Sequence, residues 1–164
     1  MATVYLSLGT NLGNREENLN KAVSQIEKRI GRISSLSAFY QTAPWGFESQ
    51  NEFLNIALKV ESTLSPVEIL RTTQNIETDL GRTLKSNGNY SDRVIDIDIL
   101  FYDKEIINTP DLVIPHPLLQ LRDFVLTPMV EIAPDFSHPI FKKNMTELLS
   151  ELKNTSNRGC SVEK

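Results

Sequence analysis

The sequence predicts an α+β domain in which two helices cover one face of an antiparallel sheet. Three observations lead to this fold class. Alternating apolar and polar residues are typical of half-buried strands, and they occur at residues 3–8, 53–60 and 93–102. Apolar residues at helical spacing fill the intervals 15–30 and 66–80. The composition, 40% hydrophobic and 23% charged, is that of an ordinary globular protein with a real core.

The first part of the chain is expected to run from a strand through a helix to a second strand. Asn14, with Glu17 three residues later, is typical of a helix N-cap after a glycine- and asparagine-rich loop. Gly31 is expected to end this helix. A strand is predicted at residues 33–40 and a loop at residues 41–51. The apolar residues of the helix are Leu19, Ala22, Val23, Ile26 and Ile30.

The second part repeats this order. The strand that begins at Phe53 has two distinct faces, and its apolar face consists of Leu54, Ile56, Leu58 and Val60. Ser65 to Glu68 form a capping box with proline at the first helical position, and Gly81 ends the second helix. A polar loop over residues 82–92 then leads into the strand at residues 93–102.

The resulting order is strand, helix, strand, strand, helix, strand, which is the ferredoxin-like βαββαβ pattern with both helices on one face. A C-terminal extension follows, in which we expect short strands, a loop at residues 113–122 and a helix near residues 144–152. The 164 residues suit one domain over residues 1–164, with a loose tail from about residue 153.

Charge and cysteine content narrow the function classes. The formal net charge of −4 argues against a general nucleic-acid binder. One cysteine, Cys160, cannot form an internal disulfide, which fits a reducing, cytoplasmic setting. We find no apolar run of membrane-spanning length and no signal peptide, so no membrane partner is expected, and we expect a monomer.

Two carboxylates on the strand at residues 93–102 carry the most informative chemistry. Period-two geometry puts Asp96 and Asp98 on one face of that strand, opposite Ile95, Ile97 and Ile99. Carboxylate oxygens suit hard cations, and two Mg²⁺ ions beside such a pair would bridge phosphate oxygens. An acidic chain that handles polyphosphate must concentrate its cations locally or recruit metal. The alternative interpretation is a solvated sheet face, and an RNA-recognition module with the same strand order would need a basic face instead.

The sequence resembles the hydroxymethyl-dihydropterin pyrophosphokinase family over nearly its whole length. Six ordered motifs carry the resemblance: Tyr5 to Gly13, Phe39 to Gly46, Phe53 to Asn55, Glu77 with Gly81-Arg82, Arg93 to Leu100, and Pro115-His116-Pro117 with Arg122 to Pro128. The family implies that the pterin hydroxymethyl oxygen attacks the β-phosphorus of ATP and that AMP leaves, in folate biosynthesis. Other two-metal phosphotransferases and a non-catalytic paralogue are the alternatives.

The resemblance also implies roles for individual residues. Asp96 and Asp98 would hold two Mg²⁺ ions, and the catalytic residues would be Arg82, Arg93 and Asp98. The ATP site would consist of Gln74, Glu77, Arg82, Lys85, Tyr90, Arg93, Ile99, His116 and Arg122. Here Tyr90 and Lys85 stand in a loop that departs from the family's usual tryptophan- and arginine-containing sequence.

The remaining implied residues form the predicted pterin slot. A flat heterocycle needs aromatic faces, which Phe53 and Phe124 could supply, and its amide-like edge suits Asn55 and Thr42. For Phe124 the alternative is an ordinary core position. The full predicted set is Thr42, Ala43, Pro44, Trp45, Phe53, Asn55, Asp96 and Phe124.

Overall fold

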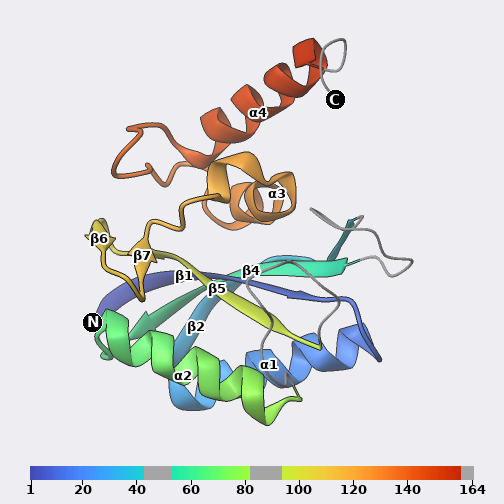
Figure 1. Ribbon diagram of the computed structural model, residues 1–164, viewed down its shortest axis with the longest axis vertical. Coiled ribbons are helices and arrows are strands. Elements are labelled where there is room, and N and C mark those ends of the chain that lie inside the picture. Colours follow the sequence, from blue (N-terminus) through green and yellow to red (C-terminus); the bar gives the residue numbers. More distant parts are fainter. Residues whose placement is uncertain (43–52, 82–93, 160–164) are drawn as a thin grey trace.

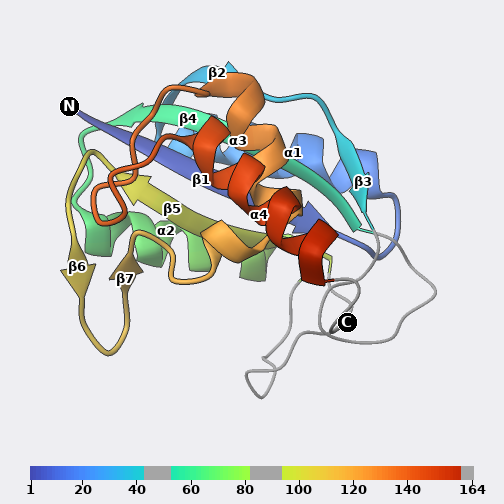
Figure 2. The same cartoon turned by 90° about the horizontal axis from the view of Figure 1, so that it is seen from above.

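The computed structural model describes residues 1–42, 53–81 and 94–159, and their helices lie on both faces of one sheet (Figure 1). Helices α1 (Arg15–Arg29) and α2 (Pro66–Asp79) cover one face. Helix α3 (Asp123–Ile132) lies over the other face, and α4 (Met145–Gly159) packs on α3. The view from above shows α3 and α4 lying across the sheet (Figure 2). Among the described residues, none of the helices has the length and apolar character that crossing a bilayer requires.

The sheet confirms the predicted fold class. Its strands are β1 (Ala2–Thr10), β2 (Gly31–Leu36), β3 (Tyr40–Thr42), β4 (Phe53–Ser62) and β5 (Asp96–Tyr102). Their order is β2-β4-β1-β5, with β3 also paired to β4, and the pairings are antiparallel. This is the ferredoxin-like arrangement. The C-terminal extension adds a two-stranded ladder, β6 (Ile107–Asn108) with β7 (Val113–Ile114), and a 3-10 helix, η1 (Leu119–Leu121).

The predicted helix signals act as expected, with one exception. The Asn14 side chain accepts a hydrogen bond from the Glu17 N–H, and Ser65 and Glu68 form the reciprocal capping box. Gly31 does not cap α1, because it is already the first residue of β2. A Cβ atom there would lie 2.0 Å from the Glu61 carbonyl oxygen, so Gly31 is needed for close approach of the backbones.

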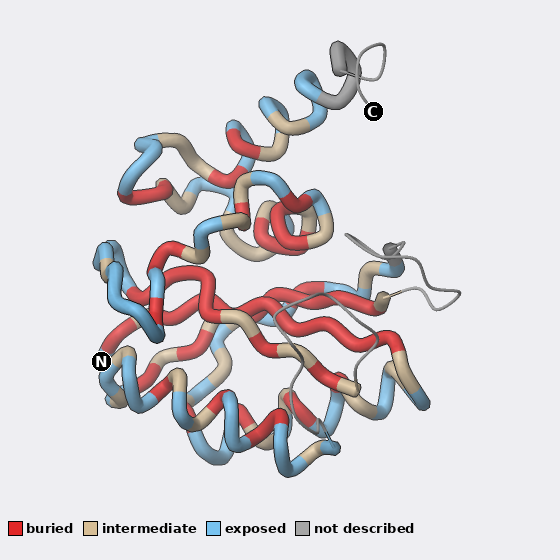
Figure 3. The backbone as a smooth tube through the Cα atoms, in the orientation of Figure 1, coloured by how far each residue is buried: buried red, intermediate tan, exposed pale blue. Residues whose placement is uncertain are grey.

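Two hydrophobic cores lie on the two faces of the sheet (Figure 3). The alternation of β4 confirms this division, because Leu54, Ile56, Leu58 and Val60 face α1 and α2, whereas Ala57 faces α3. The sheet is therefore buried on both faces over most of its area. Polar side chains can gather on the exposed part of the face over which α3 lies.

Several predicted boundaries are wrong. The strand expected at residues 33–40 is divided into β2 and β3, because the Ser37 side chain and backbone pair with Ala57 and the chain then leaves the sheet. The strand expected from residue 93 begins at Asp96. Residues 113–122, expected as a loop, include β7 and η1, and α3 was missed. The helix expected near residues 144–152 continues to Gly159.

Candidate functional site

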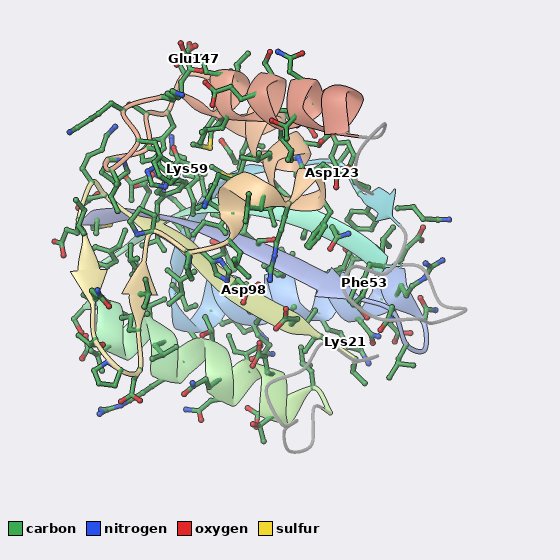
Figure 4. The ribbon with its side chains drawn as sticks, turned by 45° about the horizontal axis from the view of Figure 1, so that its top comes forward. Lys21, Phe53, Lys59, Asp98, Asp123 and Glu147 are labelled. Atoms are coloured by element: carbon green, nitrogen blue, oxygen red, sulfur yellow. The ribbon has the colours of Figure 1, made fainter. Side chains whose placement is uncertain are left out.

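The two aspartates of β5 lie on the face of the sheet that α3 covers only in part. Ile95, Ile97 and Ile99 are buried in the core on the α1 and α2 side, so Asp96 and Asp98 face the other way, as predicted. Both carboxylates are only partly buried. Figure 4 shows Asp98 on β5 and Phe53 at the start of β4. The acidic pair is therefore accessible to a ligand.

The register of the strands places residues from both predicted sites in one row across the sheet. Tyr40 pairs with Asn55, Asn55 pairs with Gly9, and Gly9 pairs with Asp96. Directly opposed residues of a sheet point to the same face. Asn55, from the predicted pterin slot, and Asp96, from the predicted metal pair, are thus separated by one glycine on β1.

Gly9 makes room in this row. A Cβ atom at residue 9 would lie 2.7 Å from Asn55 Oδ1 and 3.5 Å from Phe53 Cδ1. The Asn55 side chain, which is 3% exposed, therefore fills the space that a larger residue would occupy. The sequence alone indicated only that Gly9 follows a strand, and its role depends on the β1–β4 register.

Arg122 and Phe124 reach the site from the start of α3. Arg122 is the N-cap residue of α3, and its carbonyl oxygen accepts hydrogen bonds from the N–H groups of Val125 and Leu126. Arg122 Nη1 lies 3.9 Å from Asp98 Oδ2, and the guanidinium lies 5.6 Å from the centre of the Phe124 ring. Burial of this side chain, which is 3% exposed, lowers the pKa of Arg122 to about 10, so it remains charged at neutral pH.

His116 lies beside the same carboxylate. Its Nδ1 accepts a hydrogen bond from the Leu118 N–H, and its Nε2 lies 4.0 Å from Asp98 Oδ2. Burial lowers the pKa of His116, and the negative charge of Asp96 raises it by less. A neutral ring with Nδ1 as acceptor carries its proton on Nε2. His116 therefore presents an N–H donor toward the acidic pair.

Glu77 has a structural contact that the sequence did not predict. Its Oε2 accepts a 2.6 Å hydrogen bond from the backbone N–H of Ile97, which lies between the two aspartates. β5 is at the edge of the sheet among the described strands, and the Ile97 N–H, which donates to Glu77, points away from β1 and so needs an acceptor outside the sheet ladder. The buried carboxylate of Glu77 thus fixes β5 to α2.

Of the other residues in the predicted ATP site, the structure describes Gln74 and Ile99. Gln74 is exposed on α2, one turn before Glu77. The Ile99 side chain is buried in the core, so only its backbone, on the edge strand of the described sheet, can meet a ligand. Arg82, Lys85, Tyr90 and Arg93 lie outside the described residues. The residues that flank this segment are close together, because a Cβ atom on Gly81 would lie 3.8 Å from Val94.

The predicted pterin slot is described in part. Thr42 pairs with Phe53 through the backbone of β3, and Asn55 lies two residues further along β4. Ala43, Pro44 and Trp45 lie outside the described residues. Phe124 is half-buried beside the second core rather than fully inside it.

The donor set fits Mg²⁺ better than a transition metal. Within residues 1–42, 53–81 and 94–159, no three His, Cys, Asp or Glu side chains gather as a metal cluster. Mg²⁺ is held by one or two carboxylates and completes its shell with water and substrate phosphate oxygens. Asp96 and Asp98 would fit such a minimal set, and Arg122 and His116 lie 3.9 and 4.0 Å from the Asp98 carboxylate.

The fold and the site together define the class of protein. It is a ferredoxin-like α+β protein with an acidic pair and a buried arginine on the exposed part of its sheet. Comparison with known proteins then identifies the family. Residues 5–134 match the family model described as 7,8-dihydro-6-hydroxymethylpterin-pyrophosphokinase (HPPK). The chain belongs to this family.

Relatives agree with the family, and a solved structure agrees with the fold. The 2-amino-4-hydroxy-6-hydroxymethyldihydropteridine pyrophosphokinase of Porphyromonas gingivalis is 51% identical over 143 residues, which cover 85% of this chain and 95% of that protein. The Aquifex aeolicus protein of the same name is 42% identical over 100% of this chain and 99% of its own. The wild-type HPPK-DHPS crystal structure from Plasmodium falciparum with STZ-DHP matches with a TM-score of 0.80 at 16% identity. It covers 98% of this chain, which spans only 45% of that longer one, and it supports the fold alone.

Proposed function

We propose that this chain transfers the terminal diphosphate of ATP to the hydroxymethyl group of 6-hydroxymethyl-7,8-dihydropterin and releases AMP, as a step of folate biosynthesis. Membership of the pyrophosphokinase family supports the reaction. The single observation that carries the site is the row across the sheet. In this row Asn55, the proposed pterin contact, and Asp96, the proposed Mg²⁺ ligand, lie on either side of Gly9. Acceptor and donor substrates would then meet above β1.

Asp96 and Asp98 would hold Mg²⁺ in this proposal. When bound, Mg²⁺ supplies positive charge that offsets the negative charge of the polyphosphate. Arg122 Nη1 and His116 Nε2 lie 3.9 and 4.0 Å from Asp98 Oδ2, so groups that could bind phosphate lie beside this carboxylate. The chain's own contribution would be to hold the strand that carries both carboxylates, through the hydrogen bond from the Ile97 N–H to Glu77.

The phosphate groups would be bound by cationic and N–H donors. Arg122 is buried and charged, so its guanidinium can donate hydrogen bonds to phosphate oxygens while it stays shielded from bulk water. His116 would donate its Nε2 proton, and the open-edge backbone of Ile99 would face the nucleotide. By family resemblance, Gln74 and Glu77 would line the nucleotide side, with Arg82, Lys85, Tyr90 and Arg93.

The pterin would lie in the predicted slot, with its ring between Phe53 and Phe124 and its edge on Asn55. Phe53 and Phe124 come from different layers, since β4 lies in the sheet and α3 lies over it. Thr42, Ala43, Pro44 and Trp45 would complete the slot through the segment that follows β3. The oxygen of the hydroxymethyl group would attack the β-phosphorus, and the bond to the α,β-bridging oxygen would break.

The direct test is AMP release from ATP, Mg²⁺ and 6-hydroxymethyl-7,8-dihydropterin. We expect AMP to appear only when the pterin is present, together with an equal amount of the pterin diphosphate. The control omits the pterin, and a second control replaces it with a pterin that lacks the hydroxymethyl group. Folded protein that releases no AMP above these controls would overturn the proposed activity. Appearance of ADP in place of AMP would indicate a different phosphotransfer.

The proposal includes a monomeric protein in the cytoplasm. The sequence favours a reducing compartment through its single cysteine, Cys160. Sedimentation or gel filtration of the full chain checks the assembly, with an expected mass near the 18.6 kDa of one chain.

A further inference from the structure

We propose that Glu131 is a positioning residue for pterin binding, because it holds strand β3 at a fixed distance from the helix that carries Phe124. The inference rests on the proposed function, and in particular on the predicted pterin slot. Glu131 lies in the last turn of α3. An acidic side chain at a helix C-terminus is unfavourable to the helix dipole, so its position there has no benefit for α3 itself.

Glu131 Oε1 accepts two hydrogen bonds from one short segment. The Tyr40 hydroxyl donates at 2.6 Å, and the Ala38 backbone N–H donates at 3.0 Å. These donors are 91 and 93 residues earlier in the chain. The hydrogen bond to Glu131 raises the pKa of Tyr40, which keeps the hydroxyl protonated as a donor. Both bonds therefore tie α3 to the point where the chain re-enters the sheet.

That point lies directly beside the predicted slot. After Ser37 pairs with Ala57, the chain leaves β4 at Ala38 and returns at Tyr40 as β3. Tyr40 is then opposite Asn55, and Thr42 is opposite Phe53. β3 has only three residues, so its own pairing does little to fix it. A shift of Tyr40 would move the residues that pair with both slot side chains.

Helix α3 sets the distance between two sides of the slot. Its first turn carries Phe124, its middle packs Val125 and Met129 against the core beside Ala57, and its last turn carries Glu131. The 10 residues form one rigid element that lies over the sheet, with β3 at the sheet edge (Figure 2). Phe124 at one end and Tyr40 at the other are therefore placed by the same helix. Loss of the Glu131 contacts would leave Phe124 in place but release β3.

The expected effect is selective for the pterin. Glu131→Ala should raise the KM for the pterin about three- to tenfold, which corresponds to loss of one or two modest hydrogen bonds. The KM for ATP should change by less than about twofold, because Arg122, His116 and β5 do not depend on these bonds. Tyr40→Phe, which leaves the Ala38 bond intact, should give a smaller effect in the same direction. Glu131→Gln keeps an acceptor oxygen and should restore most of the affinity.

Glu61 offers a matched control at the other end of β4. Its two carboxylate oxygens also accept from two distant hydroxyls, those of Thr3 at 2.8 Å and Ser34 at 3.1 Å. Glu61→Ala should therefore change the unfolding midpoint about as much as Glu131→Ala while leaving the pterin KM unchanged. Equal effects of both variants on the pterin KM would reduce Glu131 to a merely structural role and overturn the proposal.

A third variant separates this inference from the slot on which it rests. Asn55→Ala removes a predicted pterin contact directly. If Asn55→Ala weakens pterin binding but Glu131→Ala and Tyr40→Phe do not, then only the positioning role is wrong. If Asn55→Ala also leaves pterin binding unchanged, the slot itself is misplaced. Should Glu131→Ala fail to fold, Tyr40→Phe still decides the outcome, because a wild-type pterin KM in Tyr40→Phe contradicts the proposal.

Discussion

The Oδ1 atom of Asn55 lies 2.7 Å from the position that a Cβ atom on Gly9 would occupy. No real Cβ atom tolerates that distance, so a methyl group at residue 9 must displace the Asn55 side chain. Asn55 is 3% exposed and lies between β1 and β3, so it has little space into which it can move. The structure therefore couples the smallest side chain of β1 to a predicted substrate contact on β4.

The first prediction follows for Gly9→Ala. Alanine is normally better tolerated than glycine inside a strand, by about 0.5–1 kcal/mol, so the fold should survive. We expect the pterin KM to rise about tenfold or more, because the displaced Asn55 loses its alignment, while the unfolding midpoint changes little. Steady-state kinetics and thermal unfolding of the same preparation check both parts.

Gly31→Ala is the contrasting control. Its Cβ atom would meet the Glu61 backbone carbonyl at 2.0 Å, so relieving this clash requires a shift of the backbone rather than of one side chain. We expect this variant to lose about 1–3 kcal/mol of stability with no selective effect on the pterin. A Gly9→Ala protein with normal pterin KM would show that Asn55 relaxes without consequence.

The second prediction concerns the acidic pair. Asp98→Asn keeps the size of the side chain but removes the charge that Mg²⁺ requires, so AMP release should fall by more than about a hundredfold. The decrease should be smaller at high Mg²⁺ if the site is weakened rather than lost. Asp111→Asn, an exposed aspartate in the loop between β6 and β7, is the control and should leave turnover unchanged. Near-normal turnover of Asp98→Asn would remove Asp98 from the metal site.

The third prediction distinguishes two roles of Glu77. As an acceptor for the Ile97 N–H, it should matter to stability, because Glu77→Ala leaves a buried donor unpaired at a cost of about 1–3 kcal/mol. Glu77→Gln can still accept this bond and should lose less than half as much. Urea unfolding measures the difference. If Glu77→Gln instead keeps full stability but raises the KM for ATP severalfold, the nucleotide contact implied by family resemblance is the more important role.

Local signals in the sequence predicted much of the fold. The alternation of β4 and the Ser65 capping box are short-range features, so they appear in the sequence as they do in the structure. Helix α3 was missed because Pro128 lies inside it, and proline in a helix interior lacks a donor and usually breaks the helix. Its apolar side, with Val125, Leu126 and Met129 in the second core, overrides that preference.

The site was predicted less completely, for a physical reason. The shared face of Asp96 and Asp98 follows from strand periodicity alone, and the structure has this geometry. The contacts of Glu131 with Tyr40 and of Glu77 with Ile97 join residues 91 and 20 positions apart, and no local pattern encodes them. The role of Gly9 likewise needs the register between β1 and β4.

The last prediction is a pH dependence of stability that originates at His138. This ring is 2% exposed, stacks on Phe141, and its Nδ1 accepts hydrogen bonds from the N–H groups of Ile140 and Phe141 at 3.1 and 3.2 Å. Protonation would place a hydrogen on Nδ1 and remove that acceptor from both donors. Burial accordingly lowers the pKa of His138 from 6.5 to about 4.

The sign of the effect follows from this shift. Between pH 6.5 and about pH 4 the unfolded chain binds a proton at His138 that the folded chain does not, so stability is full above pH 6.5 and decreases as the pH falls. The slope from this residue can reach about 1.4 kcal/mol per pH unit. Urea unfolding of wild type and His138→Asn at pH 4 to 7 isolates it, because an asparagine oxygen can accept the same backbone bonds but does not titrate. His116, the other histidine, and the carboxylates contribute equally to both proteins and cancel in the difference. We expect the wild-type advantage over His138→Asn to shrink steadily below pH 6.5, and a difference that stays constant down to pH 4 would contradict the assignment.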